Sequence, residues 1–229
     1  MTTTLRPDGP EERTAGGGRT RAYRIRVNGR DAGGLVLAAD GPRPATGRVV
    51  RLAVHPPDRG RGRGTVAALA AEEILRDWGC ADAGAVVPSG AATALRLAAA
   101  LGWTERARTL TKPLPGGPPG GPLDAAPLVR ELRHADTGEA TGAVRVSLAH
   151  GLPDGTGAFV HRIDVPERFR AQGNARALLL LAEDTARDAG SGRIGLTLHA
   201  GELDLVRADR LLRTLGYLPA AHHVYKSLR

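Results

Sequence analysis

The chain has 229 residues, 41% of them hydrophobic, and a formal net charge of +8 at pH 7, so its length fits one large domain or two small ones. Its single cysteine, Cys80, excludes an internal disulfide and a cysteine-rich metal site. No stretch approaches the ~18 consecutive apolar residues of a membrane span, and the polar start lacks the apolar run of a secretory signal, so we expect a cytoplasmic protein.

The excess of positive charge is confined to the first half of the chain. Residues 20–112 carry 15 basic and 8 acidic groups, whereas residues 124–229 carry 14 and 13. An anionic partner is therefore expected for the first half. A polyanionic cofactor satisfies this expectation as well as a nucleic acid would.

The first half begins with residues 1–19, which are polar, include three successive glycines and are predicted to be disordered. Two apolar runs, Tyr23–Val27 and Leu35–Ala38, then flank Asn28-Gly29, a turn signal typical of a hairpin. The pattern that follows predicts a strand, a long helix, a strand, a second helix and a last strand, over Val49–Val54, Thr65–Trp78, Ala83–Val87, Ala91–Ala100 and Arg106–Lys112.

Next, the segment Pro113–Leu123 reads PLPGGPPGGPL and is predicted to be a linker. Beyond it the same order of elements returns: three strands, helix, strand, helix and strand, over Val129–His134, Ala143–Leu148, Val160–Val165, Ala175–Ala189, Ile194–His199, Leu203–Leu215 and His222–Ser227. Residues 20–112 and 124–229 are thus predicted to form two tandem α/β modules, each a mixed, mostly antiparallel sheet with flanking helices.

The two halves are internal repeats. A shift of 111 residues places Ala71–Gly79 on Ala182–Gly190, with Ala, Glu, Arg, Asp and Gly in corresponding positions. Farther on, Leu101–Trp103 matches Leu215–Tyr217 with an offset of 114, as a loop insertion of three residues would produce. An agreement of this length indicates a duplicated module.

In each half, a basic turn lies between the third strand and the long helix. Backbone N–H groups at the start of a helix lack internal partners, and the helix dipole favours negative charge there. Small residues let a pyrophosphate approach this backbone, and arginine adds charge-assisted hydrogen bonds. Neither turn has the Gly-Lys-Ser/Thr of a Walker loop or the Gly-x-Gly-x-x-Gly of a dinucleotide fold. The predicted phosphate-binding residues are Arg59, Gly60, Arg61, Gly62, Arg63 and Gly64 in the first turn, and Arg170, Ala171, Gln172, Gly173, Asn174 and Ala175 in the second.

The shared skeleton Arg-x-x-Gly-x-Gly/Ala, with Leu-Gly-aromatic downstream, resembles the coenzyme-A-binding motif of the GNAT N-acetyltransferase superfamily. Its appearance in both halves resembles actinobacterial tandem GNAT proteins. The resemblance implies acetyl-CoA as cofactor and direct transfer of the acetyl group to a primary amine of an acceptor. It also implies that the third strand of each half splays from its neighbour and binds the pantetheine arm through its backbone, at Leu52, Ala53 and Val54 and at Ile163, Asp164 and Val165.

The sequence departs from the family at the general acid. Where the family often has a tyrosine, the two halves have Ala98 and Leu212. As catalytic residues we therefore consider His161, a candidate base on the third strand, and Tyr225, a replacement acid. Purely structural roles are the alternative for both, as they are for the further candidates His55 and Tyr217. The paired acids Glu72/Glu73 and Glu183/Asp184 are expected on the solvated faces of their helices.

Two other functions compete with an acetyltransferase. A non-catalytic CoA-binding scaffold would explain the missing tyrosines, and an arginine–glycine contact to nucleic acid would explain the first turn. The nearly neutral second half, which has a matching turn, argues against nucleic acid. His222 and His223 lack a third ligand, so no metal site is expected. We expect a monomer or a homodimer, and the sequence does not identify the acceptor amine.

Overall fold

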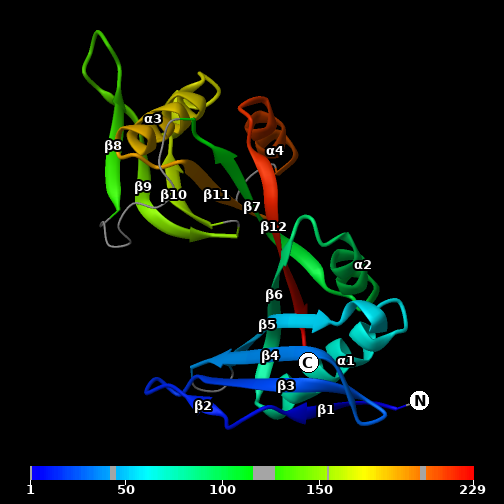
Figure 1. Cartoon of the computed structure of the whole chain (residues 1–229). Coiled ribbons are helices and arrows are strands. Elements are labelled where there is room, and N and C mark those ends of the chain that lie inside the picture. Colours follow the sequence, from blue (N-terminus) through cyan, green and yellow to red (C-terminus); the bar gives the residue numbers. More distant parts are fainter. Residues whose placement is uncertain (1, 42–44, 116–126, 154, 202–204) are drawn as a thin grey trace. The chain divides into compact units, whose positions relative to one another are not determined.

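The computed structural model describes residues 2–41, 45–115, 127–153, 155–201 and 205–229. Contacts divide the chain into two compact units: unit 1 comprises Met1–Arg106 and His223–Arg229, and unit 2 comprises Ala107–His222. Each unit combines a mixed sheet with helices (Figure 1). The predicted α/β architecture of two tandem modules is therefore confirmed.

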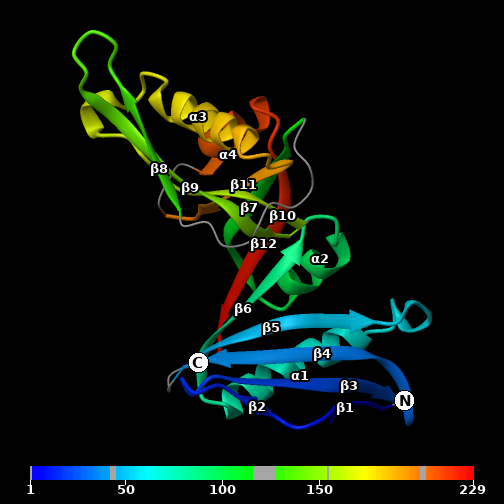
Figure 2. The same cartoon turned by 60° about the vertical axis from the view of Figure 1, so that its left-hand side comes forward.

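The strands of unit 1 are hydrogen-bonded in the order β1-β3-β4-β5-β6, with β2 beside β3. Neighbours from β1 to β5 are antiparallel, whereas β5 and β6 are parallel. Figure 2 shows α1 lying along one face of this sheet. The elements are β1 (Thr3–Pro7), β2 (Glu12–Arg13), β3 (Arg19–Val27), β4 (Arg30–Asp40), β5 (Ala45–Val54), α1 (Arg63–Asp77), β6 (Cys80–Pro88) and α2 (Ala92–Ala100).

Unit 2 repeats the same plan, in the order β7-β11-β10-β9-β8. Here β10 and β11 are the parallel pair, and the other neighbours are antiparallel. The elements are β7 (Thr104–Pro113), β8 (Leu128–Arg133), β9 (Ala140–Leu152), β10 (Gly155–Asp164), α3 (Asn174–Asp188), β11 (Arg193–His199), α4 (Leu205–Thr214) and β12 (Leu218–Ser227).

The last strand of each half contributes to the unit that the other half forms. Residues Ala107–Pro113 of β7 pair antiparallel with His199–Arg193 of β11, inside unit 2. Conversely, His223–Arg229 at the end of the second half belong to unit 1. The boundaries 20–112 and 124–229 describe the repeats in the sequence, and the compact units differ from them by this exchange.

The N-terminal tail, expected to be disordered, is ordered in the structure. Strand β1 pairs with β3 in a register that sets Leu5 opposite Ile25. Leu5 packs against the buried residues of unit 1, and Thr3 accepts a hydrogen bond from Arg63 at 2.8 Å. A strand of an antiparallel sheet with one solvated face needs apolar residues only on its covered face. Because residues 1–19 are mostly polar, the sequence pattern did not predict strand β1.

The predicted linker lies largely outside the described residues, since positions 116–126 are not among them. Its first residues, however, belong to unit 2. Pro113 ends β7, and Leu114 is buried with its N–H donating to the Gly192 carbonyl at 2.9 Å. The predicted helix over Leu203–Leu215 is α4, whose described residues begin at Leu205.

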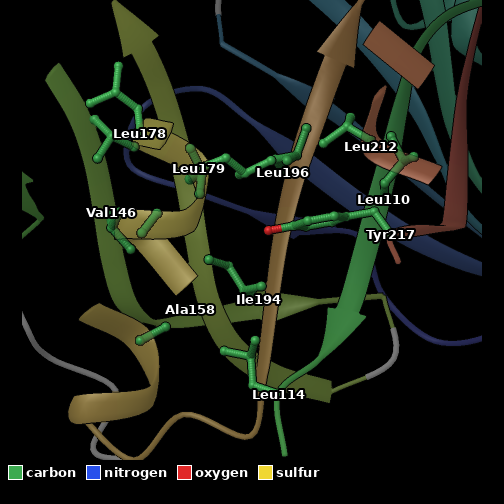
Figure 3. Close-up of a cluster of buried hydrophobic side chains, with 14 of the residues drawn as sticks. Leu110, Leu114, Val146, Ala158, Leu178, Leu179, Ile194, Leu196, Leu212 and Tyr217 are labelled. Atoms are coloured by element: carbon green, nitrogen blue, oxygen red, sulfur yellow. The ribbon is translucent and has the colours of Figure 1, made fainter. Parts of the chain in front are cut away.

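Each unit has a core between its sheet and its helices. Figure 3 shows the core of unit 2, in which Leu178 and Leu179 of α3 meet Val146, Ile194 and Leu196 of the sheet. Tyr217 projects its side chain into the same cluster. No helix among the described residues is both long and apolar enough to cross a membrane.

Two helix residues expected in solvent are buried. Glu72 of α1 and Glu183 of α3 are 2% and 0% exposed, whereas their neighbours Glu73 and Asp184 are exposed as expected. Glu183 Oε2 lies 2.7 Å from Lys112 Nζ, and Arg187 donates to the same oxygen at 2.9 Å. Burial is tolerated because a cation on an exchanged strand compensates the carboxylate. Helical periodicity alone does not reveal this partner.

Candidate functional site

In unit 1 the parallel strands β5 and β6 separate at a β-bulge. They are paired from Ala45 and Cys80 to Val49 and Ala85, and β5 then continues to Val54 without β6. The bulge is at Val50, since Val49 pairs with Leu37 and Arg51 with Val36. An extra residue bends its strand and increases the local twist, which explains the separation.

Unit 2 has the same split at the equivalent position. β10 and β11 are paired only from Ala158 to Val160, and β10 continues to Asp164. Its bulge residue is His161, since Val160 pairs with Val146 and Arg162 with Arg145. The predicted pantetheine-binding segments, Leu52–Val54 and Ile163–Val165, therefore lie just beyond the two splits. Along Leu52–Val54 and Ile163–Asp164, one edge of the backbone is paired with β4 or β9, and no pairing to β6 or β11 occupies the other.

The two basic turns have nearly identical backbones. Each starts with a single 3-10 turn, at Pro56–Asp58 and at Glu167–Phe169, followed by an extended arginine. Positive φ angles follow at Gly60 (71°) and Gly62 (73°), and at Ala171 (60°) and Gly173 (84°). Arg59 donates its Nε–H to the Val54 carbonyl at 2.9 Å, and Arg170 to the Val165 carbonyl at 3.3 Å. The same sequence skeleton therefore gives the same turn twice.

Both helix starts are open. The N-cap residues Gly62 and Gly173 provide no capping side chain, and the first helical bonds run to their carbonyls from Val66 and Ala177. Within the described chain, the backbone N–H groups of Gly64 and Ala175, in the first turns, have no acceptor. A Cβ added at Gly62 or Gly173 would meet no atom within 4 Å. Unbonded N–H donors, open space and a helix dipole are the features that favour an anion at a helix start.

Ala171 is the strained residue of the second turn. A φ of 60° is uncommon for a residue other than glycine, and such conformations concentrate at ligand-binding loops. Two side chains brace the turn: Asn174 Nδ2 donates to the Phe169 carbonyl at 2.9 Å, and Gln172 Nε2 to the Arg168 carbonyl at 3.0 Å. Asn174 and Gln172 thus support the backbone of the loop.

The arginines of the first turn play different parts. Arg63 is 8% exposed and bonds to Thr3, so it anchors β1. Arg59 and Arg61 are exposed beside the open helix start. Asp58, for which no sequence pattern predicted a role, is buried and forms a bidentate pair with Arg30 at 2.7 and 3.0 Å. The Arg30 guanidinium lowers the pKa of Asp58. Their ion pair connects the 3-10 turn to the first residue of β4.

His161, the candidate base, lies at the bulge of unit 2. Its Nε2 is 2.6 Å from Ser147 Oγ, and its ring packs edge-on against Phe159 and His150, with ring centres 5.0 and 5.6 Å apart. His161 is exposed, and partial desolvation by its neighbours lowers its pKa, with further contributions from His150 and Arg145. The imidazole is therefore neutral near pH 7 and able to accept a proton. Sequence reasoning missed Ser147 and His150, because a bulge changes which residues share a face.

The two tyrosine candidates lie in different surroundings. Tyr217 is fully buried, and burial, followed by the charge of Glu183, raises its pKa strongly. Tyr225 belongs to unit 1, where its ring would touch a Cβ at Gly84 at 3.0 Å and lies 5.9 Å from the Arg106 guanidinium. The structure therefore places Tyr225 and His161 in different units.

The remaining candidates, His55 and Cys80, lie in contrasting surroundings. His55 is exposed and precedes the 3-10 turn at Pro56. Cys80 is buried in the core of unit 1, as expected, and burial raises its pKa. In the described part of the chain, no three His, Cys, Asp or Glu side chains gather closely enough to hold a metal ion.

Comparison with known proteins supports the same reading of the two units. The family model of the acetyltransferase (GNAT) family matches residues 5–103 and 124–217. A GCN5-related N-acetyltransferase from Sphaerobacter thermophilus is similar in structure with a TM-score of 0.58 and 17% identity, over 91% of this chain and 81% of that one. A tandem GNAT protein from the clavulanic acid biosynthesis pathway has a TM-score of 0.51 and 18% identity, over 93% and 84%.

At these identities the structural likeness concerns the fold alone. No curated protein matches the sequence. The family model, by contrast, covers most of both halves, including both open helix starts and both Leu-Gly-aromatic segments. The chain therefore belongs to the acetyltransferase (GNAT) family, as a tandem of two modules.

Proposed function

We propose that the protein is an N-acetyltransferase that transfers the acetyl group of acetyl-CoA directly to a primary amine. The family supports acyl transfer in general. The observation that carries the finer proposal is the pair of open helix starts, each placed at the end of a strand that has split from its parallel neighbour. A long thioester cofactor with a pyrophosphate fits a site of this form.

In this proposal both units bind the cofactor. The pyrophosphate accepts hydrogen bonds from the backbone around Gly62 or Gly173, and Arg59, Arg61 or Arg170 adds positive charge. The pantetheine amides bond to the free backbone edge of Leu52–Val54 or Ile163–Val165. Gly64 and Ala175 are interchangeable here, because a Cβ at Gly64 would make only ordinary contacts at 3.5 Å or more.

Unit 2 is the unit that catalyses transfer. Strand pairing makes Val50 the equivalent of His161, and Ala38 the equivalent of Ser147, since Ala38 pairs with Arg48 as Ser147 pairs with Phe159. Unit 1 therefore keeps the cofactor loop but has no imidazole at its bulge. This difference favours the scaffold role, our alternative function, for unit 1 alone.

The transfer step uses neutral His161 as the base. If Nε2–H donates to Ser147 Oγ, Nδ1 is left to accept the proton as the amine nitrogen attacks the thioester carbonyl. The new C–N bond forms, the C–S bond breaks, and the thiolate of CoA leaves. The imidazolium then returns its proton to the thiolate, so no second acid is needed in unit 2. Tyr225, the other candidate acid, lies in unit 1 and takes no part in this step.

Calorimetry and thiol release test this function separately. Titration with acetyl-CoA should give two sites per chain, and a thiol-reactive dye should detect CoA release when a primary amine is added. Replacement of His161 by Gln should abolish most of the release while both binding sites remain. Binding without release from any amine would leave the scaffold function, and absence of binding would refute both.

A further inference from the structure

One face of the unit 2 sheet carries charged and aromatic side chains around His161. Ser147 and Phe159 are paired across β9 and β10, and the contact between Ser147 and His161 places the imidazole on their face. The core residues Val146 and Val160 point to the opposite face, where α3 and α4 pack. The described helices of unit 2 therefore leave the face of His161 uncovered.

Two arginines on this face stand directly opposite each other. Arg145 pairs with Arg162 across β9 and β10, and both side chains are exposed. Like charges at paired positions repel. Asp164 compensates one of them, since its carboxylate lies 2.6 Å from Arg162 Nε. In the part of the chain that the structure describes, no carboxylate pairs with Arg145, so the cluster retains one positive charge.

The same cluster is missing from unit 1. Arg51 is the equivalent of Arg162, and its partner across the strand is Val36. The arginine pair and the imidazole thus occur together in one unit, although both units have the same bulge and the same split. Since the fold forms without the second arginine in unit 1, Arg145 is available for a ligand.

We propose that Arg145, supported by Arg162, binds an anionic group of the acceptor, so that the acceptor is an amine that also carries a carboxylate or a phosphate. This inference rests on the proposed function and names its substrate class. A guanidinium binds both anions through parallel hydrogen bonds, and it would hold the acceptor on the face from which His161 can take the amine proton. A neighbouring cation also disfavours the ammonium form of the acceptor, which is the form that cannot attack.

A matched series of two-carbon amines tests the substrate class. In β-alanine, phosphoethanolamine, ethanolamine and ethylenediamine, a two-carbon chain joins the amine to a second group. The four compounds differ in the charge of that second group. We expect at least one of the two anionic amines to exceed ethanolamine by about tenfold or more in kcat/KM, with ethylenediamine the poorest. The better of the two anionic amines identifies the anion. Equal rates for ethanolamine, or a preference for ethylenediamine, would overturn the proposal.

Substitution of Arg145 provides a second test of the substrate class. Arg145→Gln should raise KM for the preferred anionic amine by about tenfold and change KM for ethanolamine much less. Arg130→Gln, an exposed arginine on β8 of the same unit, is the control and should change neither. An unchanged KM in Arg145→Gln contradicts the assignment.

A binding measurement keeps the anion site separate from catalysis. Inorganic phosphate should shift the NMR signals of the His161 imidazole, assigned with His161→Gln, and Arg145→Gln should weaken that binding about tenfold. Chloride at the same ionic strength should not reproduce the shift. If phosphate has no effect on His161, the anion site is refuted. If phosphate binds but no amine releases CoA, the proposed function fails and the anion site stands.

Discussion

Lys226 Nζ lies 2.7 Å from Glu72 Oε2, although 154 residues separate the two in the chain. The carboxylate is 2% exposed, and its other oxygen accepts a hydrogen bond from Trp103 Nε1 at 2.9 Å. Lys112 and Glu183 repeat the arrangement in unit 2, and these are the two lysines of the chain. Each exchanged strand therefore places one lysine beside one buried glutamate.

Removal of one of these lysines should destabilise the protein. In Lys226→Met the Glu72 carboxylate loses its nearest cation while it stays buried, and breaking a buried pair in this way costs about 3–5 kcal/mol. We expect a loss of that order in the free energy of unfolding, measured by urea denaturation followed through tryptophan fluorescence. Trp103 reports on unit 1 directly, because its indole bonds to the same carboxylate.

The control for Lys226→Met is a pair in the same unit that is exposed. Arg48 and Asp40 are 2.7 Å apart, and their side chains are 55% and 60% exposed. Arg48→Met should cost less than about 1 kcal/mol, since surface ion pairs contribute little. Equal losses in Arg48→Met and Lys226→Met would show that the buried lysine has no special part in holding the exchanged strand.

Gly173→Asp should remove the cofactor from unit 2. The new carboxylate stands at the open helix start, where it competes with a pyrophosphate for the same N–H donors. Calorimetry with acetyl-CoA should then give one site per chain in place of two. The thiol release that we assign to unit 2 should be lost as well.

Gly173→Asn separates charge from backbone strain. Residue 173 has a φ of 84°, which asparagine tolerates about as well as aspartate does. The amide has nearly the same shape but no charge, so Gly173→Asn should retain two sites with weaker binding at one. Retention of two sites in Gly173→Asp would remove the basis for a pyrophosphate at this helix.

The order of elements could be predicted from the sequence because the same pattern occurs in both halves. The shift of 111 residues aligned the helices α1 and α3, and the shared Arg-x-x-Gly skeleton located both turns at the helix starts that the structure shows. Glycine marks these turns for a physical reason: positive φ angles occur at Gly60, Gly62 and Gly173. This prediction therefore rested mostly on local requirements of the backbone, such as positive φ angles in the turns.

Non-local pairings were beyond the reach of the sequence. Nothing in the pattern of Arg106–Lys112 states that its residues pair with Arg193–His199 of the other half. The burial of Glu72 beside exposed Glu73 depends on Lys226, so the helical period could not separate the two acids. Likewise the bulge at His161, which decides its face, leaves no mark on the alternation of apolar residues.

The pH profile should report the imidazole of His161. Partial desolvation holds the pKa of His161 below the usual 6.5, and only the neutral ring accepts a proton. Transfer at saturating acceptor should therefore persist through pH 6.5 and decline as the pH falls through that lowered pKa. In His161→Gln we expect kcat to drop by about 10²–10⁴-fold and the acidic limb to vanish from the profile.

Ser147→Ala is the companion variant to His161→Gln. It removes the hydroxyl 2.6 Å from Nε2 and should lower kcat while the acidic limb remains, since the imidazole is still present. An acidic limb that persists in His161→Gln would assign the titration to another group. A profile that is identical in wild type and both variants would exclude His161 from the transfer step.

Tyr217→Phe should leave transfer intact. The ring of Tyr217 is fully buried among the core residues of unit 2, and burial together with the Glu183 charge raises the pKa of its hydroxyl strongly. The Glu183 carboxylate beside it keeps its ion pairs with Lys112 and Arg187 when the phenol oxygen is removed, so the buried charge stays compensated. We therefore expect kcat and the free energy of unfolding to stay close to wild type. A large loss of kcat without a loss of stability would instead identify Tyr217 as the acid that protonates the thiolate, and would require unit 2 to open at that position during transfer.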